Sequence, residues 1–404
     1  MSTTDTTDIP PEVLRARMVD FVREQGYART AAVEEAMRTV PRHLFVPTAS
    51  IQTAYGDLAV SIKDAADGTM LSCASVPTVV AMMLDQLDVH PGMRILEIGA
   101  GTGYNAALLA HLTGSGGSVT TVDYDPEITT GARRNLDATG YDHVHVATRD
   151  GALGDPEHAP YDRIIVTVGA WDIPTTWRTQ LAYGGRLVLP LRWRGQSESI
   201  AFTQHGDHLE SDAVELCGFV PMIGQEGELT AHLDHDQQVA LYWDVDQPID
   251  PTALHGVLTT TKTSSWSGVT VGRYEPFHGV WVRLSAAEPG TCRIAADLAA
   301  VTSGLCTPAT PSRSAALVEG DSLAYFSLRR FTDMTDDRAA ELGAIGHGPK
   351  GADLAERLCE QIRSWGQDRT ATSLITAYPA GTPEKHFLGT HTIRKSNSTL
   401  VISY

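Results

Sequence analysis

The chain has 404 residues, 42% of them hydrophobic, which is enough for two domains with a core each. Its 49 acidic and 31 basic residues give a formal net charge of −18, which argues against partners such as nucleic acids or anionic membranes. The five cysteines form no Cys-x-x-Cys pair, so neither a disulfide framework nor a metal site is expected. Without a signal-peptide core or an apolar run of membrane length, the sequence predicts a cytoplasmic protein.

Residues 1–50 are expected to form a helical segment that packs on the core. Residues 11–24 have the spacing of an amphipathic helix that opens on proline, and residues 31–39 predict a second helix. The second helix stops at Val-Pro-Arg-His-Leu-Phe-Val-Pro, residues 40–47. A lone histidine before an apolar trio is more often structural than catalytic, so His43 is interpreted as structural.

Two serines precede the helix expected at residues 78–87. Ser72 and Ser75 could donate hydrogen bonds to a substrate carboxylate, although a Ser-x-Pro sequence is also common as a turn or a helix cap. The segment leads directly into a buried strand, so the fold is expected to place it over the ligand edge of the sheet.

The central feature of the sequence is a strand, a glycine turn and a helix. Residues 95–98 are apolar with β-branched members, residues 99–103 hold three glycines in five positions, and residues 104–112 are rich in Ala and Leu. A second strand at residues 119–122 ends on Asp123, which is placed to accept hydrogen bonds from a ribose diol.

The spacing of the glycines discriminates between two ligand classes. Dinucleotide enzymes use Gly-x-Gly-x-x-Gly, whereas here the spacing is Gly-x-Gly-x-Gly and Tyr104 takes the place of the last glycine. Glu97, just before the turn, suits an amino or hydroxyl group better than a phosphate. The pattern therefore favours S-adenosylmethionine over a dinucleotide, and also over a turn that binds nothing.

Further strands are expected at residues 144–147, 164–168 and 186–190, and residues 216–224 close the core. Asp150, after the first of these strands, could contact an adenine amine. Alternating strands and helices predict an α/β fold with a doubly wound parallel sheet over residues 51–224.

The remaining chain is expected to comprise an acidic linker, residues 225–250, and a C-terminal α+β domain, residues 251–404. Within that domain, strands are expected at residues 279–284, 322–330 and 398–404, and a helix at residues 351–365. Since this part shows no nucleophile or metal pattern, it is expected to serve binding rather than chemistry, and the negative charge of the chain would suit a neutral or basic peptide partner. We expect docking on the apolar helix face that comprises Leu354, Leu358, Ile362 and Trp365.

Several segments together resemble the protein-L-isoaspartate O-methyltransferase family over residues 12–224. They are Val-Pro-Arg-His-Leu-Phe-Val-Pro, Ser-Val-Pro, Leu-Glu-Ile-Gly-Ala-Gly-Thr-Gly-Tyr-Asn-Ala-Ala, Arg-Asp-Gly at 149–151, Ala-Pro-Tyr-Asp-Arg-Ile at 159–164 and Gly-Gly-Arg-Leu-Val-Leu-Pro at 184–190. The resemblance implies a Rossmann-like class I methyltransferase core that uses S-adenosyl-L-methionine and releases S-adenosyl-L-homocysteine. One departure lies at residues 67–74, where the family commonly has Gly-x-x-Gln-Thr/Ser before the serine.

The resemblance also implies site residues. In the family the serine of the Ser-x-Pro segment lies at the substrate carboxylate, which makes Ser75 the expected catalytic residue, with Ser72 and Tyr55 as further substrate-binding residues. The expected cofactor-binding residues are Glu97, Gly99, Ala100, Gly101, Thr102, Gly103, Asp123, Tyr124, Asp150 and Gly151.

The C-terminal part resembles, more loosely, the extension of actinobacterial family members that accompany modified ribosomal peptides of the lanthipeptide or graspetide type. The segments that carry this resemblance are 344–349 and 378–383. It implies methylation of an aspartate in a cyclised precursor peptide, which leads to a succinimide (aspartimide) and to aspartate or isoaspartate. The alternatives are repair of isoaspartate in damaged proteins and a scaffold protein without catalysis.

Overall fold

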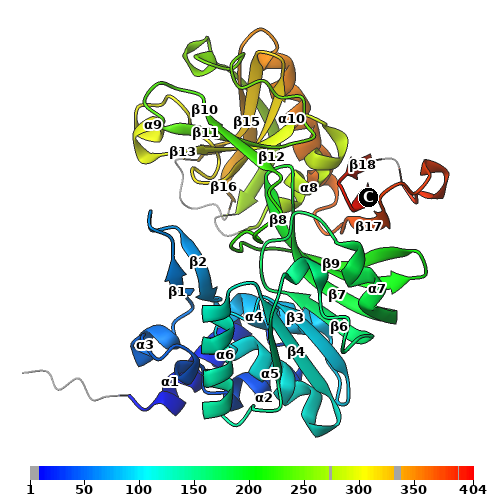
Figure 1. Cartoon of the computed structure of the whole chain (residues 1–404). Helices are drawn as coiled ribbons and strands as arrows, with labels where there is room; N and C mark the ends of the chain where they lie inside the picture. Colours follow the sequence, from blue (N-terminus) through cyan, green and yellow to red (C-terminus); the bar gives the residue numbers. More distant parts are fainter. Residues whose placement is uncertain (1–8, 273–274, 332–337, 390) are drawn as a thin grey trace, which may run out of the picture. The chain divides into compact units, whose positions relative to one another are not determined.

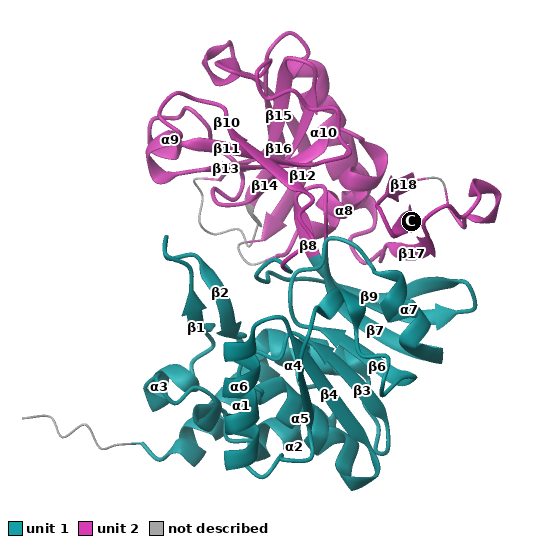
Figure 2. Cartoon of the chain, viewed as in Figure 1, with its two compact units in different colours: residues 1–191, 198–222 teal, residues 192–197, 223–404 magenta. Residues whose placement is uncertain are grey.

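The computed structural model describes residues 9–272, 275–331, 338–389 and 391–404 (Figure 1). It divides into two compact units, of which unit 1 holds Met1–Leu191 and Glu198–Met222, and unit 2 holds Arg192–Ser197 and Ile223–Tyr404 (Figure 2). Within the described ranges, no helix has the length and apolar character that crossing a membrane requires. A cytoplasmic location stays a prediction.

Unit 1 begins with helices that pack on its core. The elements in order are α1 (Pro11–Glu24), α2 (Ala31–Thr39), η1 (Arg42–Phe45), α3 (Ile51–Ala54), the antiparallel hairpin of β1 (Val60–Asp64) and β2 (Met70–Ala74), and α4 (Pro77–Leu87). The buried side of α1 comprises Met18, Val19 and Val22, and Thr30 caps α2 by accepting a hydrogen bond from the Val33 N–H. Both helices occupy the predicted ranges.

The sheet of unit 1 has the strand order β5-β4-β3-β6-β7-β8-β9, with the glycine turn after its central strand. Its elements are β3 (Arg94–Ile98), α5 (Tyr104–Thr113), η2 (Gly114–Gly116), β4 (Ser118–Asp123), α6 (Pro126–Ala138), β5 (His145–Thr148), η3 (Gly151–Leu153), β6 (Tyr161–Val166), α7 (Thr175–Gln180), β7 (Leu181–Trp193), β8 (Gln196–His205) and β9 (His208–Leu216). Strands β3 to β7 pair in parallel, and β8 pairs with β9 in the antiparallel sense. Because β3 lies between β4 and β6, the strand order reverses at β3, where ligands bind in such sheets.

Unit 2 contains a seven-stranded antiparallel sheet in the order β10-β11-β13-β14-β15-β16-β12. Its elements are β10 (Glu228–His232), β11 (Val239–Asp244), η4 (Val257–Thr259), β12 (Thr263–Gly272), α8 (His278–Ala287), β13 (Thr291–Ala296), α9 (Leu298–Thr302), β14 (Ser314–Glu319), β15 (Ser322–Arg330), β16 (Arg338–His347) and α10 (Gly351–Gln367). A three-stranded antiparallel arrangement follows, formed by β17 (Leu374–Pro379), β18 (His391–Arg394) and β19 (Ser398–Ser403), with η5 (Glu384–His386) between β17 and β18.

Three expectations for the C-terminal part differ from the structure. Residues 225–250, expected as a linker, contain the paired strands β10 and β11 of the unit 2 sheet. Residues 279–284, expected as a strand, lie in α8. The apolar face of α10 is not a docking surface, because its four side chains are at most 5% exposed and belong to the core between α10 and the sheet.

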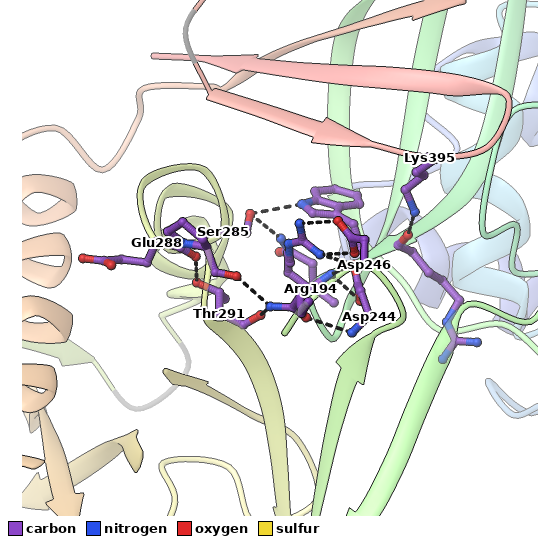
Figure 3. Close-up of polar contacts among 12 residues, drawn as sticks. Arg194, Asp244, Asp246, Ser285, Glu288, Thr291 and Lys395 are labelled. Atoms are coloured by element: carbon purple, nitrogen blue, oxygen red, sulfur yellow. Dashed lines mark hydrogen bonds and ion pairs between the residues drawn. The ribbon is translucent and has the colours of Figure 1, made fainter. Parts of the chain in front are cut away.

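The tip of the β7–β8 hairpin, Arg192–Ser197, belongs to unit 2, although most of both strands belongs to unit 1. Arg194 there is 7% exposed, and its guanidinium pairs with Asp244 at 3.0 Å and with Asp246 at 2.6 Å (Figure 3). The indole of Trp193 donates to the Ser285 hydroxyl at 3.0 Å, and Lys395 donates to the Arg192 carbonyl at 2.6 Å. The tip is therefore held by buried and charged contacts from three separate segments of unit 2.

Candidate active site

The glycine turn after β3 requires glycine for steric reasons. Gly99 has a φ of +100°, and a Cβ atom there would lie 2.5 Å from the Thr167 hydroxyl oxygen. That hydroxyl donates to the Ile98 carbonyl at 3.1 Å and to the Gly99 carbonyl at 2.7 Å. Thr167 was not among the predicted site residues, although its place just after β6, beside the central strand, was the available signal.

Asp123 lies where the sequence analysis placed it, half-buried at the carboxyl end of β4. Its Oδ2 accepts a hydrogen bond from the Gly101 N–H at 3.3 Å, and its Oδ1 accepts one from the Asp125 N–H at 3.2 Å. Burial raises the pKa of the Asp123 carboxyl, and these two N–H groups oppose the rise. The carboxylate thus lies against the glycine turn and holds lone pairs for further donors.

Glu97 is fully buried beneath the turn. Its Oε2 accepts from the Thr121 hydroxyl at 2.6 Å, and its Oε1 accepts from the Asn105 amide at 2.8 Å. Burial raises the pKa of Glu97 to about 7 against the lowering effect of these two bonds. The Glu97 carboxylate therefore connects β3 to β4 and to the start of α5 by hydrogen bonds. Contact between Glu97 and a ligand stays a prediction.

Two residues in the middle of the turn have buried side chains. Ala100 and Thr102 are 4% and 6% exposed, and the Thr102 carbonyl accepts from the Asn135 amide of α6 at 3.0 Å. Gly103 packs against α6, because a Cβ atom there would lie 3.1 Å from Leu136. Gly101 and Gly103 both have positive φ. The turn is therefore fixed between β4 and α6.

The neighbouring strand end supplies the second predicted acid. Asp150 follows β5 and is exposed, and its Oδ1 accepts from the Ala152 N–H at 2.9 Å. Gly151 is buried, and its carbonyl accepts from the Trp177 indole at 2.8 Å. Tyr124, directly after Asp123, is 63% exposed and so is available to cover a bound ligand. The structure brings these residues to the same edge as the turn, since β4 and β5 pair in parallel.

The segment that carries Ser75 approaches the glycine turn. A Cβ atom at Gly101 would lie 3.5 Å from the Cys73 carbonyl oxygen, so β2 passes close to the turn. Ser75 follows β2 and precedes α4, and its hydroxyl interacts with the Cys73 thiol. Burial raises the pKa of Cys73, while Arg42 and Ser75 act in the opposite direction.

The other two predicted substrate residues have different surroundings. Tyr55 is 6% exposed, and its hydroxyl lies 2.8 Å from the His43 Nδ1, which agrees with a structural interpretation of that histidine. Ser72 lies opposite Lys63 in the β1–β2 hairpin. Lys63 pairs with Asp125 at 2.6 Å, two residues beyond Asp123. This ion pair joins the hairpin to the segment that follows Asp123.

These residues fit a cofactor with a ribose diol and an adenine ring, because two acids lie on adjacent strand ends beside a turn whose three glycines all have positive φ. In the described ranges, no group of three His, Cys, Asp or Glu side chains is arranged to hold a metal ion. A family model described as protein-L-isoaspartate(D-aspartate) O-methyltransferase (PCMT) matches residues 14–227, slightly more than half of the chain.

The chain belongs to this family. Its relatives include the protein-L-isoaspartate O-methyltransferases of Methanopyrus kandleri, 42% identical over 216 residues, and of Hyperthermus butylicus, 41% identical over 223 residues. Each alignment covers 53% of this chain, and the aligned parts are 92% and 90% of the two relatives. The protein is an S-adenosylmethionine-dependent protein carboxyl methyltransferase, as the sequence predicted.

A solved structure described as a protein-L-isoaspartate O-methyltransferase aligns with 96% of this chain and 99% of its own length, with a TM-score of 0.51 and 21% identity. At this identity the likeness concerns the fold alone. It confirms the Rossmann-like α/β fold of the methyltransferase family, and it extends beyond residue 227 into the C-terminal unit.

Proposed function

We propose that this methyltransferase acts on the free α-carboxylate of isoaspartyl residues in proteins or peptides. The observation that carries the proposal is the approach of the Ser75 segment to the glycine turn, with the Cys73 carbonyl beside Gly101. The Ser75 hydroxyl suits a carboxylate, and the acids Asp123 and Asp150 suit the cofactor. All three then lie at one edge of the sheet.

The reaction requires few catalytic groups from the protein. Bound S-adenosylmethionine would supply an electrophilic methyl group on its sulfonium. A carboxyl group with a pKa of about 4 is already ionised at neutral pH, so no strong general base is needed. One carboxylate oxygen forms the new O–CH₃ bond as the C–S bond breaks, and Ser75 would orient that carboxylate while the buried turn excludes water. The ester then reacts with the backbone nitrogen of the following residue, methanol leaves, and a succinimide forms that water opens.

The comparisons support isoaspartate better than the tailoring of an aspartate in a cyclised peptide. The tailoring interpretation rested largely on the additional C-terminal domain. A solved structure described as a protein-L-isoaspartate O-methyltransferase extends over nearly the whole chain, so this architecture is not confined to tailoring enzymes. The proposed docking face on α10 is also buried.

One observation still favours tailoring as a second candidate. Residues Ser72, Cys73 and Ala74 depart from the usual lead into the serine, and they lie in the hairpin beside the glycine turn. A changed lead would alter which peptide conformation fits, and unit 2 could then contribute to binding the peptide.

The test compares three peptides of one sequence: linear with isoaspartate, linear with aspartate, and macrocyclic with aspartate. Mass spectrometry follows the gain of a methyl group and the later loss of methanol. We expect turnover of the linear isoaspartyl peptide with little on the other two. Turnover of the macrocyclic aspartyl peptide alone would establish tailoring in its place.

A further inference from the structure

Arg42 lies directly beneath the Ser75 segment and is completely buried. Its Nη2 donates to the Ser75 carbonyl at 2.8 Å and to the Ala74 carbonyl at 3.3 Å, and its Nε donates to the Ala54 carbonyl at 2.9 Å. The guanidinium carbon lies 5.0 Å from the centre of the Tyr104 ring, on the first turn of α5. One side chain thus ties the serine segment to α3 and to the helix that follows the glycine turn.

Among the residues that the structure describes, no acid forms an ion pair with Arg42. Its three hydrogen-bond acceptors are backbone carbonyls, and Nη1 has no hydrogen-bond partner among the described residues. Asp57 attracts the Arg42 guanidinium only at longer range, and its Oδ1 accepts hydrogen bonds from the N–H and the hydroxyl of Thr78. A buried cation without a paired anion is costly. Its place beneath Ser75 therefore suggests an anion that arrives with the substrate.

The hydrogen bonds of Arg42 also fix two donors. In a trans peptide the C=O and N–H groups point in opposite directions. Because the carbonyls of Ala74 and Ser75 point toward Arg42, the N–H groups of Ser75 and Val76 point away from it. Both N–H groups lie just before α4, an 11-residue helix whose dipole favours anions at this end, where the Asp57 carboxylate already accepts from the Thr78 N–H.

We propose that Arg42 is a positioning residue for the substrate carboxylate. It holds the N–H groups of Ser75 and Val76 toward the substrate and fixes the backbone that carries the Ser75 hydroxyl, and its unpaired charge favours the ionised carboxyl over the neutral one. This inference rests on the proposed function, since it assumes that the substrate presents a carboxylate at Ser75. Arg42 itself stays buried and acts through the segment that it holds.

The experiment uses the full chain with Arg42→Met and Arg42→Lys. Calorimetry with S-adenosylhomocysteine present measures the affinity for an isoaspartyl peptide and for its isoasparaginyl counterpart, which has a neutral amide in place of the carboxylate. We expect wild type to prefer the carboxylate, and Arg42→Met to lose that preference by about tenfold or more, while affinity for the amide changes little. The acid limb of the kcat profile should also move to higher pH, because the bound carboxyl loses a nearby cation.

Arg42→Lys keeps the charge without the fork of donors, so it should retain part of the preference while kcat falls. This variant keeps the test decisive if Arg42→Met does not fold. The matched control is Arg133→Met, since Arg133 on α6 also donates to two backbone carbonyls, those of Val144 and Tyr141. The control should keep the preference.

An equal loss of affinity for both peptides in either variant would mean that Arg42 only stabilises the fold, and the proposal would be overturned. A wild-type preference in Arg42→Met would overturn it as well. Wild type distinguishes this failure from that of the proposed function: if wild type does not methylate the isoaspartyl peptide, the function is wrong, whatever the variants do.

Discussion

Glu97 should make unit 1 less stable as the pH rises. The carboxyl is fully buried, and its pKa is raised from 4.5 to about 7, chiefly by burial. Below pH 4.5 the carboxyl is protonated in the folded and the unfolded chain, so it carries no penalty. Between the two pKa values only the folded chain keeps the proton, so unfolding releases it and stability falls with rising pH.

The size of the effect follows from the difference between the two pKa values. At about 1.4 kcal/mol for each pKa unit, the full loss above pH 7 is about 3.5 kcal/mol. Glu97→Gln keeps the shape of the side chain and can still accept from Asn105, but it does not ionise. The variant should therefore lack this fall and be more stable than wild type above pH 7.

Hydrogen exchange of the α5 amides, measured without ligand from pH 5 to pH 9, reports on unit 1 separately from unit 2. The exchange rates are corrected for the intrinsic exchange rate at each pH. The difference in stability between variant and wild type then gives the contribution of Glu97. Glu24→Gln, at the exposed end of α1, is the control and should follow wild type. Parallel curves for Glu97→Gln and wild type would refute the reasoning.

Three further predictions concern the site. Asp123→Ala should weaken S-adenosylmethionine binding by about tenfold or more in calorimetry, because it removes charged hydrogen bonds worth about 1.4 kcal/mol or more. The control is Asp162→Ala, which removes a carboxylate bonded to the Arg94 N–H at the opposite end of β3 and should leave binding unchanged. Ser75→Ala should lower turnover and leave cofactor affinity unchanged, because the Ser75 hydroxyl is expected to contact the substrate carboxylate and not the cofactor; an equal loss of cofactor binding would mean that the serine only shapes the pocket. Lys63→Met should speed cofactor dissociation in stopped flow, since it frees the hairpin from Asp125, and an unchanged rate would count against that link.

The sequence predicted the strand, glycine turn and helix because local chemistry determines them. Glycines with positive φ, a buried strand and an acid at a strand end each leave a mark within a few residues. The support of the turn could not be predicted in this way. Thr167 lies 68 residues beyond Gly99, and Arg42 lies 33 residues before Ser75, so only the folded chain shows that they meet.

The C-terminal part was predicted less well because its local signals conflict. Val280, Trp281 and Val282 have high strand propensity, yet Val280 and Leu284 lie one helical turn apart and are both buried in α8. The acids of residues 225–250 suggested a solvated linker. The alternation of Val239, Leu241 and Trp243 in β11 was the better signal.

The helix at residues 351–365 was predicted correctly, but its face was misinterpreted. An amphipathic pattern indicates that one side of a helix is covered, but it does not indicate what covers that side. Here the sheet of unit 2 covers it. Without the structure, a core helix and a docking helix have the same pattern.

The hairpin tip at residues 192–197 has a consequence for how the protein is made and divided. The ribosome delivers Trp193 and Arg194 long before Asp244, Ser285 and Lys395, so unit 2 cannot be completed until its last strands have emerged. A fragment that starts at residue 223 would lack Arg194, whose backbone N–H and guanidinium both bond to the Asp244 carboxylate. A fragment that stops at residue 222 would expose the tip. Cutting the chain at the end of the family match would therefore separate this tip from the residues of unit 2 that hold it.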